Sequence, residues 1–168
     1  RINATYRDCG DVNAPTMLAL AVEDFTGIKV DNFALFDFEG FEQVINGVGG
    51  VEICSEYPLR DAKSYLDFPG GCVNADGAMA LAWVRSRKTQ QLVNGSWRSV
   101  PGASDLLRNE HQQDVLIQLA TKLRTFESPT DLSNKIEELS NAFAVDDGLS
   151  LSDTLSLAWS LRDVDVTT

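Results

Sequence analysis

Basic side chains gather in the short stretch Arg85 to Lys88, which holds three of the chain's 14 basic residues. If this stretch is extended, Arg85 and Arg87 project from the same face, because side chains alternate along a strand. Two guanidinium groups about 6 Å apart repel by about 2–3 kcal/mol at an effective dielectric near 20. A bound phosphate or pyrophosphate would relieve that repulsion through bidentate hydrogen bonds. The alternative is a solvated basic patch after a helix C-terminus, where the helix dipole favours cations.

A second set of polar residues falls on one face of a helix expected from Ser104 to about Thr125. Asp105, Arg108 and Gln112 lie within about 60° of one another on that helix. The same stripe continues with the apolar residues Leu116, Leu119 and Leu123. Because an apolar stripe marks the side that faces the interior, the polar half is expected to face the interior or a cleft, where it needs partners. The alternative is an Asp–Arg pair on a helix surface, worth some tenths of a kcal/mol.

Several common functional classes are excluded by composition and by missing motifs. The net charge of −11 argues against nucleic-acid binding, which needs an excess of Lys and Arg. The single histidine, His111, and the lack of a G-x-S-x-G turn or a Gly-rich phosphate loop disfavour the usual hydrolase and nucleotide machinery. No run approaches the roughly 20 apolar residues of a membrane-spanning helix, and 168 residues suit one ordinary domain.

The three cysteines suggest a disulfide rather than a zinc site, because structural zinc needs about four clustered Cys or His ligands. Cys54 and Cys72 bracket a polar loop, and a disulfide between them would contribute about 3 kcal/mol by the chain-entropy estimate. Such a bond implies an oxidising, extracytoplasmic location. The alternative is a pair of buried free thiols. Cys9 is then unpaired, and either packs in this chain or bonds to a segment outside it.

Hydrophobic periodicity predicts an α/β fold. Helices are expected over Pro15–Phe25 and Phe41–Val48, with strands over Phe33–Phe38 and Val51–Cys54. Strand, helix and strand at this spacing indicate a βαβ unit, and hence a central mixed sheet flanked by helices. The polar segment Thr89–Gly102 is expected to be a surface loop. Further helices are expected from Asn74 or Asp76 through Trp83, over Pro129–Phe143 and over Leu151–Arg162, with an edge strand over Asp163–Thr167.

Six stretches, in order and at their spacing, resemble the LytR-CpsA-Psr family of bacterial cell-envelope phosphotransferases. They cover nearly everything from Ile2 to about Leu119, and the paired cysteines are similar to those of actinobacterial members. The six stretches are Arg1–Tyr6 (similar to the family's K-I-N-A-A-Y), Thr26–Ile28, Asp37–Phe41, Gly47–Glu52, Asp76–Arg87 and Asp105–Gln113.

The resemblance implies transfer of a glycopolymer phosphate from a polyprenyl-pyrophosphate carrier to peptidoglycan outside the cytoplasmic membrane, with pyrophosphatase activity as a side reaction. By position, Arg85, Arg87, Arg108 and Gln112 match the family's pyrophosphate-binding residues. Asp105 matches the conserved acid and would orient Arg108, so that these two form the catalytic pair. These roles suit phosphoryl transfer, which depends on positioning and on stabilising the spreading negative charge.

Two departures from the family pattern shape the expectations. His111 stands where the family has Arg, about 100° from the polar stripe, so a role at the rim of the site is expected. The resemblance also implies earlier strands, whose Asp and Arg residues hold magnesium and complete the anion site. Residues 1–168 are therefore expected to be the C-terminal portion of a single catalytic domain. Its Mg²⁺ ligands and first strands would come from upstream sequence or from a second chain.

The prenyl chain would need an apolar groove, which is expected between the Pro15–Phe25 helix and the sheet. A rival interpretation is a non-catalytic module that binds a polyprenyl phosphate or an anionic glycan. A third is a structural α/β domain with a solvated arginine patch.

Overall fold

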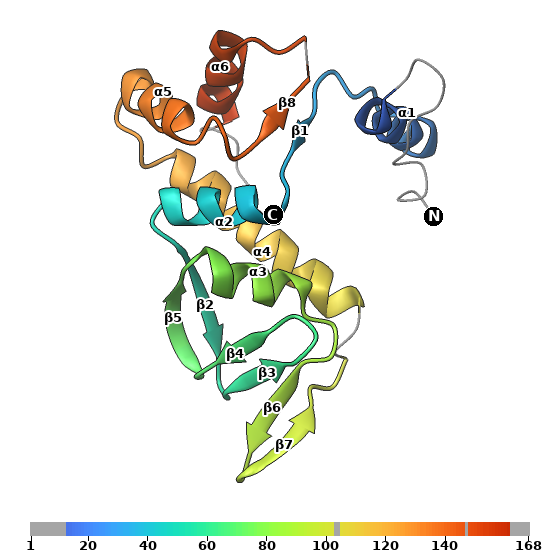
Figure 1. Cartoon of the computed structure of the whole chain (residues 1–168), viewed down its shortest axis with the longest axis vertical. Helices are drawn as coiled ribbons and strands as arrows, with labels where there is room; N and C mark the ends of the chain where they lie inside the picture. The colour runs from blue at the N-terminus through green and yellow to red at the C-terminus, as the bar shows by residue number, and fades with distance from the viewer. Residues whose placement is uncertain (1–12, 103–104, 147, 162–168) are drawn as a thin grey trace.

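The computed structural model describes residues 13–102, 105–146 and 148–161 (Figure 1). These residues form six helices and eight short strands. The helices are α1 (Ala14–Thr26), α2 (Phe38–Gly47), α3 (Gly77–Arg85), α4 (Asp105–Leu123), α5 (Pro129–Glu138) and α6 (Leu151–Leu161). The strands are β1 (Ala34–Leu35), β2 (Val51–Ser55), β3 (Leu59–Asp61), β4 (Leu66–Phe68), β5 (Gly71–Ala75), β6 (Gln90–Val93), β7 (Ser96–Ser99) and β8 (Ala144–Val145).

The described strands form three small antiparallel sheets, in the orders β1-β8, β2-β5 and β4-β3-β6-β7. The α/β class is thus confirmed, but the expected βαβ unit is wrong, because β2 pairs with β5 and not with β1. The expected loop at residues 89–102 is also wrong, since β6 and β7 form a hairpin there. Its turn is Asn94-Gly95, and both residues have positive φ, as a tight two-residue hairpin turn requires.

Helix α3 is the centre of the hydrophobic core. Six of its residues are buried, and Trp83 packs against Phe68 of β4. The helix starts at Asp76, whose carboxylate accepts a hydrogen bond from the Met79 backbone, the usual arrangement at a helix N-cap. A Cβ at Gly77 would collide with the backbone of Glu42, so this glycine lets α2 and α3 pack closely. The core thereby fixes the direction in which α3 delivers Arg85 and the residues after it.

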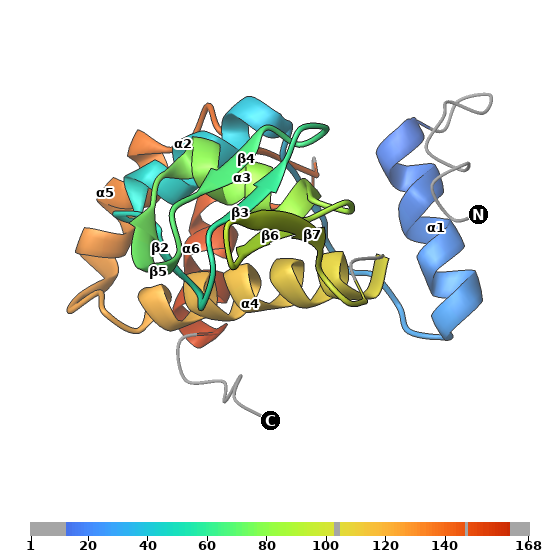
Figure 2. The same cartoon turned by 90° about the horizontal axis from the view of Figure 1, so that it is seen from below.

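Helix α1 stands apart from the other elements in both views (Figures 1 and 2). None of its residues is buried, and Phe25 is 83% exposed. The predicted helix over Pro15–Phe25 is confirmed, and its apolar side chains are at most half-buried. Helix α5 ends at Glu138, short of the predicted Phe143, because the chain turns there towards β8. Cys9 and the edge strand expected at residues 163–167 lie outside the described residues. Among the described helices, none has the length and apolarity to cross a bilayer.

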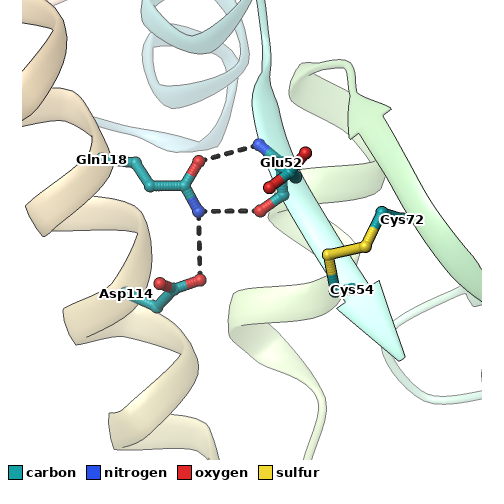
Figure 3. The surroundings of a disulfide bond; sticks show 5 residues. All are labelled: Glu52, Cys54, Cys72, Asp114 and Gln118. Carbon is teal, nitrogen blue, oxygen red and sulfur yellow. Dashed lines mark hydrogen bonds between the residues drawn. A yellow bond between two sulfur atoms is a disulfide. The ribbon is translucent and has the colours of Figure 1, made fainter. Parts of the chain in front are cut away.

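Cys54 and Cys72 form the predicted disulfide (Figure 3). The two residues are direct register partners on β2 and β5, so the bond crosses this two-stranded sheet. The alternative of two free thiols is therefore wrong. On the same strand, the Gln118 side chain of α4 bonds both backbone groups of Glu52, at 2.8 and 2.7 Å. These contacts fix the middle of α4 against the sheet.

Candidate functional site

Two arginines from separate segments converge on one carboxylate. Arg87 follows α3, while Asp105 and Arg108 lie in the first turn of α4. Asp105 Oδ1 lies 3.3 Å from Arg87 Nε and 3.2 Å from Arg108 Nη1. Two positive charges thus share one negative charge, which leaves a local positive excess on a chain of net charge −11. The side chains of Arg87 and Asp105 are 60% and 71% exposed, so their ion pair adds little to stability and leaves both groups reachable by a ligand.

Arg87, Asp105 and Arg108 form an ion cluster, of which Arg108 is the most buried member. One N–H donor of Arg108 has no partner among the described residues. Its side chain is 20% exposed. Its Nε is buried and has no hydrogen-bond partner among the described residues. A buried N–H without an acceptor costs about 1–3 kcal/mol, and more for a charged group. Asp105 therefore holds Nη1 of the guanidinium group, while the buried Nε is left without an acceptor among the described residues.

Asp61 of β3 fixes the backbone that carries Arg87. Its side chain is buried, and its Oδ2 accepts hydrogen bonds from Ser86 Oγ at 2.8 Å, from Arg87 N at 3.1 Å and from Lys88 N at 2.9 Å. Its Oδ1 accepts from Lys63 N at 2.9 Å. Burial is the largest single influence and acts to raise the pKa of Asp61, but the hydrogen bonds together outweigh it and lower that pKa. The stretch from Arg85 to Lys88, called the basic segment below, is therefore anchored on a buried carboxylate.

Asp61 was not predicted as a site residue from the sequence. Its position nevertheless carried a signal, because Leu59 and Asp61 are both buried and lie on one face of β3. An Asp two residues after an inward-facing Leu lies on the same buried face of the strand, so its carboxylate needs hydrogen-bond donors. The signal was hidden because residues 55–71 were expected to form a loop.

Arg85 and Arg87 do not project from one face of a strand. Arg85 is the last residue of α3, and its guanidinium lies 4.2 Å above the ring of Phe38, in a cation–π contact. Ser86 is extended, and Arg87 turns towards Asp105. The expected pairing of these two guanidinium groups is therefore wrong, and the structure instead brings Arg87 together with Arg108.

Gln112 lies one turn beyond Arg108 on α4 and joins that helix to α3. Its Nε2 donates a hydrogen bond to the Val84 carbonyl at 3.2 Å. This carbonyl belongs to the last turn of α3, directly before Arg85. Gln112 thus lies beside the basic segment, as its place on the predicted stripe requires.

His111 does not lie at the rim. It is 7% exposed, and its ring stacks on Trp83 with 3.7 Å between ring centroids. Its Nδ1 lies 3.3 Å from the Trp83 carbonyl. Burial lowers the pKa of His111, although the Trp83 carbonyl and the charges of Glu110 and Asp114 act to raise it. The residue is part of the packing between α3 and α4, and the expectation of a rim role is wrong.

The apolar half of the α4 stripe lines a large cavity. This cavity has a volume of about 510 Å³ and lies among α2, α4, α5, α6 and the β1-β8 pair. Leu116, Leu119 and Leu123 form its α4 wall. Leu116 is 64% exposed, so the stripe borders open space rather than a filled core. The described residues that line the cavity include none from α1, contrary to the expected groove beside residues 15–25.

No group of three or more His, Cys, Asp or Glu side chains is placed to hold a metal ion, as far as the structure describes the chain. The acidic side chain in the cluster, Asp105, is engaged by two arginines. The residues that the structure describes therefore do not make a magnesium site by themselves.

The fold and the site now allow a comparison with known proteins. The model of the LytR_cpsA_psr family matches residues 1–167. A probable cell wall biosynthesis protein, LcpB of Corynebacterium glutamicum, is 30% identical over 151 residues, which are 90% of this chain and 34% of that protein. The polyisoprenyl-teichoic acid–peptidoglycan teichoic acid transferase TagV of Bacillus subtilis is 32% identical over 130 residues, or 73% of this chain and 29% of TagV.

Among solved structures, a LytR-Csp2A-Psr enzyme from Actinomyces oris superposes with a TM-score of 0.68 at 27% identity. The match covers 80% of this chain and 51% of that chain. The α/β domain described here is thus of the kind found in cell-envelope LytR-CpsA-Psr proteins. The chain belongs to the LytR-CpsA-Psr family. It spans about a third of the length of the curated relatives it matches.

Proposed function

We propose that this chain is part of a phosphotransferase that attaches a cell-wall glycopolymer, delivered on a polyprenyl-pyrophosphate carrier, to peptidoglycan. The names of its relatives support glycopolymer transfer in the cell wall. The observation that carries the proposal for the carrier is the single face of α4. That face begins with the cationic cluster at Asp105 and Arg108 and continues along the 510 Å³ apolar cavity. An amphiphile with an anionic head and a long hydrocarbon tail matches both ends.

The cationic cluster suits the pyrophosphate head. Arg87 and Arg108 would bind phosphate oxygens through their free N–H groups, and Asp105 would hold both guanidinium groups in place. Arg85 and the amide of Gln112 would complete the ring of hydrogen-bond donors around the pyrophosphate. As the acceptor hydroxyl attacks the phosphorus, negative charge spreads over the phosphoryl oxygens and the leaving polyprenyl phosphate. Donors fixed before the reaction stabilise that charge without reorganising. Water in place of the hydroxyl would give the pyrophosphatase side reaction.

The apolar cavity suits the prenyl tail. Arg108 and Leu123 are 15 residues apart on α4, so the face that joins head to tail is about 22 Å long. Each CH₂ group that moves from water into such a cavity contributes about 0.8 kcal/mol. Tail burial would therefore supply most of the affinity, and the arginine cluster would set the position of the reacting phosphorus.

The disulfide supports an extracytoplasmic location for this chemistry, because disulfides persist in oxidising compartments. We expect magnesium to assist the reaction, held by residues outside this chain. The upstream part of the same domain, or a second chain, would supply those ligands.

The experiment compares the wild type with Arg87→Ala in binding a polyprenyl-pyrophosphate analogue and in glycopolymer transfer to peptidoglycan. Removing a charged hydrogen-bond donor costs about 1.5–3 kcal/mol, so the affinity for the analogue should fall about 10- to 150-fold. Arg98→Ala is the matched control, since Arg98 is exposed on β7 and lies outside the cluster.

Unchanged affinity in a folded Arg87→Ala variant would assign the arginines to solvent and contradict the proposal. Tight binding of the analogue without transfer by the full-length protein would favour the rival role of a binding module.

A further inference from the structure

A second cavity, of about 400 Å³, borders the basic segment at Arg85. It lies where α2 and α3 meet the turn between β3 and β4, and Arg85 lines one end of it. Its polar lining consists of Glu42, Ser64, Tyr65, Asp67, Asp76 and Arg85. Three carboxylates therefore face one cation. In the described part of the chain, these carboxylates make no cluster that could hold a metal ion.

Ser64 gives independent support for a ligand in this cavity. Its side chain is 4% exposed, yet its Oγ has no hydrogen-bond partner in the described part of the chain. Buried hydroxyl groups in folded proteins are nearly always hydrogen-bonded, because an unpaired one loses its interactions with water. A ligand with hydroxyl groups would supply the missing partner.

Tyr65 adds an aromatic surface at the mouth of the cavity. It is 85% exposed, far more than most large side chains of this domain. Its φ of 62° lies in the left-handed region, which is unusual for a residue other than glycine. The turn between β3 and β4 thus presents an aromatic ring to solvent, at a position where Asn or Gly would be easier to accommodate.

The charge of the cavity narrows the ligand class. Glu42 and Asp67 make no hydrogen bond or ion pair with the described residues, so their oxygens are available as acceptors. Carboxylates repel phosphates but accept hydrogen bonds strongly from hydroxyl groups. A sugar ring offers hydroxyl groups at its edge and an apolar C–H face that packs on an aromatic ring. Its chemistry matches an exposed Tyr beside free carboxylates.

We propose that this cavity is a sugar-binding subsite, in which a ring packs on Tyr65 and its hydroxyl groups bond to Ser64, Glu42 and Asp67. The inference rests on the proposed function, since Arg85 lies at the border between this subsite and the pyrophosphate site. Two substrates of that reaction carry sugar rings: the peptidoglycan acceptor and the glycopolymer end next to the pyrophosphate. The acidic lining favours the ring that has no phosphate attached, which is that of the acceptor.

The test uses Tyr65→Asn in the full-length protein, because Asn tolerates the left-handed backbone and removes only the ring. Soluble, uncrosslinked peptidoglycan glycan strands are titrated into the wild type and the variant, with binding followed by calorimetry or NMR. The affinity for the strands should fall about tenfold. Ser64→Ala should weaken binding severalfold without lowering the melting temperature, because its hydroxyl has no partner in the protein. Trp97→Leu is the control for loss of an aromatic side chain outside the cavity.

A second arm repeats the titrations with a sugar-pyrophosphate analogue that carries a short prenyl tail. Loss of strand binding alone assigns the subsite to the acceptor, and loss of analogue binding alone assigns it to the donor sugar. If Tyr65→Asn changes neither affinity, or if the wild type binds neither ligand, the inference is overturned. If Arg87→Ala leaves analogue binding intact while Tyr65→Asn still weakens strand binding, the proposed function fails and the sugar subsite stands.

Discussion

The two ends of the α4 face differ in what they leave unsatisfied. At the first turn, Asp105 compensates Arg87 and Arg108, and the unmet need is one buried N–H of Arg108. Two turns further on, Leu116 and the leucines that follow border an open volume of about 510 Å³. Protein interiors normally pack like organic crystals, with few voids larger than a water molecule. The first turn of α4 thus lacks a hydrogen-bond acceptor for Arg108. The apolar end lacks the apolar atoms that would fill its cavity.

This difference shows how one helix can serve two chemistries. The polar end needs fixed directions, and Asp61 supplies them through bonds to the backbone of the basic segment. The apolar end needs only space and a hydrocarbon lining, because burial of apolar surface is not directional. Changes at the two ends should therefore have separable effects, and the predictions below rely on that separation.

Filling the apolar end should have the largest effect. Ala120 lines the cavity, and Ala120→Trp would occupy part of its volume. Affinity for a long-chain polyprenyl pyrophosphate should fall at least about 100-fold, since several CH₂ groups at about 0.8 kcal/mol each lose their place. Affinity for inorganic pyrophosphate should stay the same in calorimetric titrations. Equal losses for both ligands would mean that the two ends are not separable.

Removing Arg108, the buried donor at the polar end, should weaken the binding of long-chain and of inorganic pyrophosphate equally. Arg108→Ala should cost about 1.5–3 kcal/mol for the long-chain and the inorganic pyrophosphate, measured by the same titrations. Arg108→Lys keeps the charge but cannot bind in the same bidentate geometry, so it should restore only part of the affinity. Full recovery of affinity in Arg108→Lys would show that pyrophosphate binding depends only on the positive charge at this position.

Replacing Asp61, which anchors the backbone of the basic segment, should lower the affinity for pyrophosphate through its effect on Arg87. Asp61→Asn loses the negative charge that accepts four hydrogen bonds, and pyrophosphate affinity should fall about tenfold. In an Arg87→Ala background the same change should have little further effect, since residues that act as a unit are not additive. Additive losses in this double-mutant cycle would give Asp61 a general structural role instead.

The smallest expected effect is the pH dependence contributed by His111. Its pKa is lowered by burial, so between its ordinary value of about 6.5 and the lower folded value the unfolded chain binds more protons. Stability should therefore decrease as the pH falls below about 6.5, with a slope of at most about 1.4 kcal/mol per pH unit. His111→Phe, which preserves stacking on Trp83, should flatten that part of the profile in denaturant melts. An unchanged slope would exclude His111 as the cause.

The sequence predicted local features well where one short segment contains the whole signal. The helices follow from periodicity, and Asp76 is one of the two caps expected from residue type. That Arg87 belongs with Asp105 and Arg108 was expected only from the family resemblance. The disulfide was predicted from the segment between its two cysteines.

Features that depend on tertiary contacts were not predicted. The pairing of β2 with β5 depends on which strand returns to it, and the burial of His111 depends on the approach of Trp83 from another helix. Arg85 was placed beside Arg87 because nothing in its own segment indicates that Phe38 lies under it. Asp61 was missed because residues 55–71 were expected to form a loop, and three of its donors come from a segment about 25 residues away.

The bond between Gln118 and Glu52 has a consequence for association with other chains (Figure 3). Among the described strands, β2 pairs only with β5, and its other side is the kind of open sheet margin that recruits foreign strands. The Gln118 amide offers Glu52 one donor and one acceptor, as a neighbouring peptide unit would. A side chain thus takes the place of the next strand, which protects this margin from intermolecular pairing.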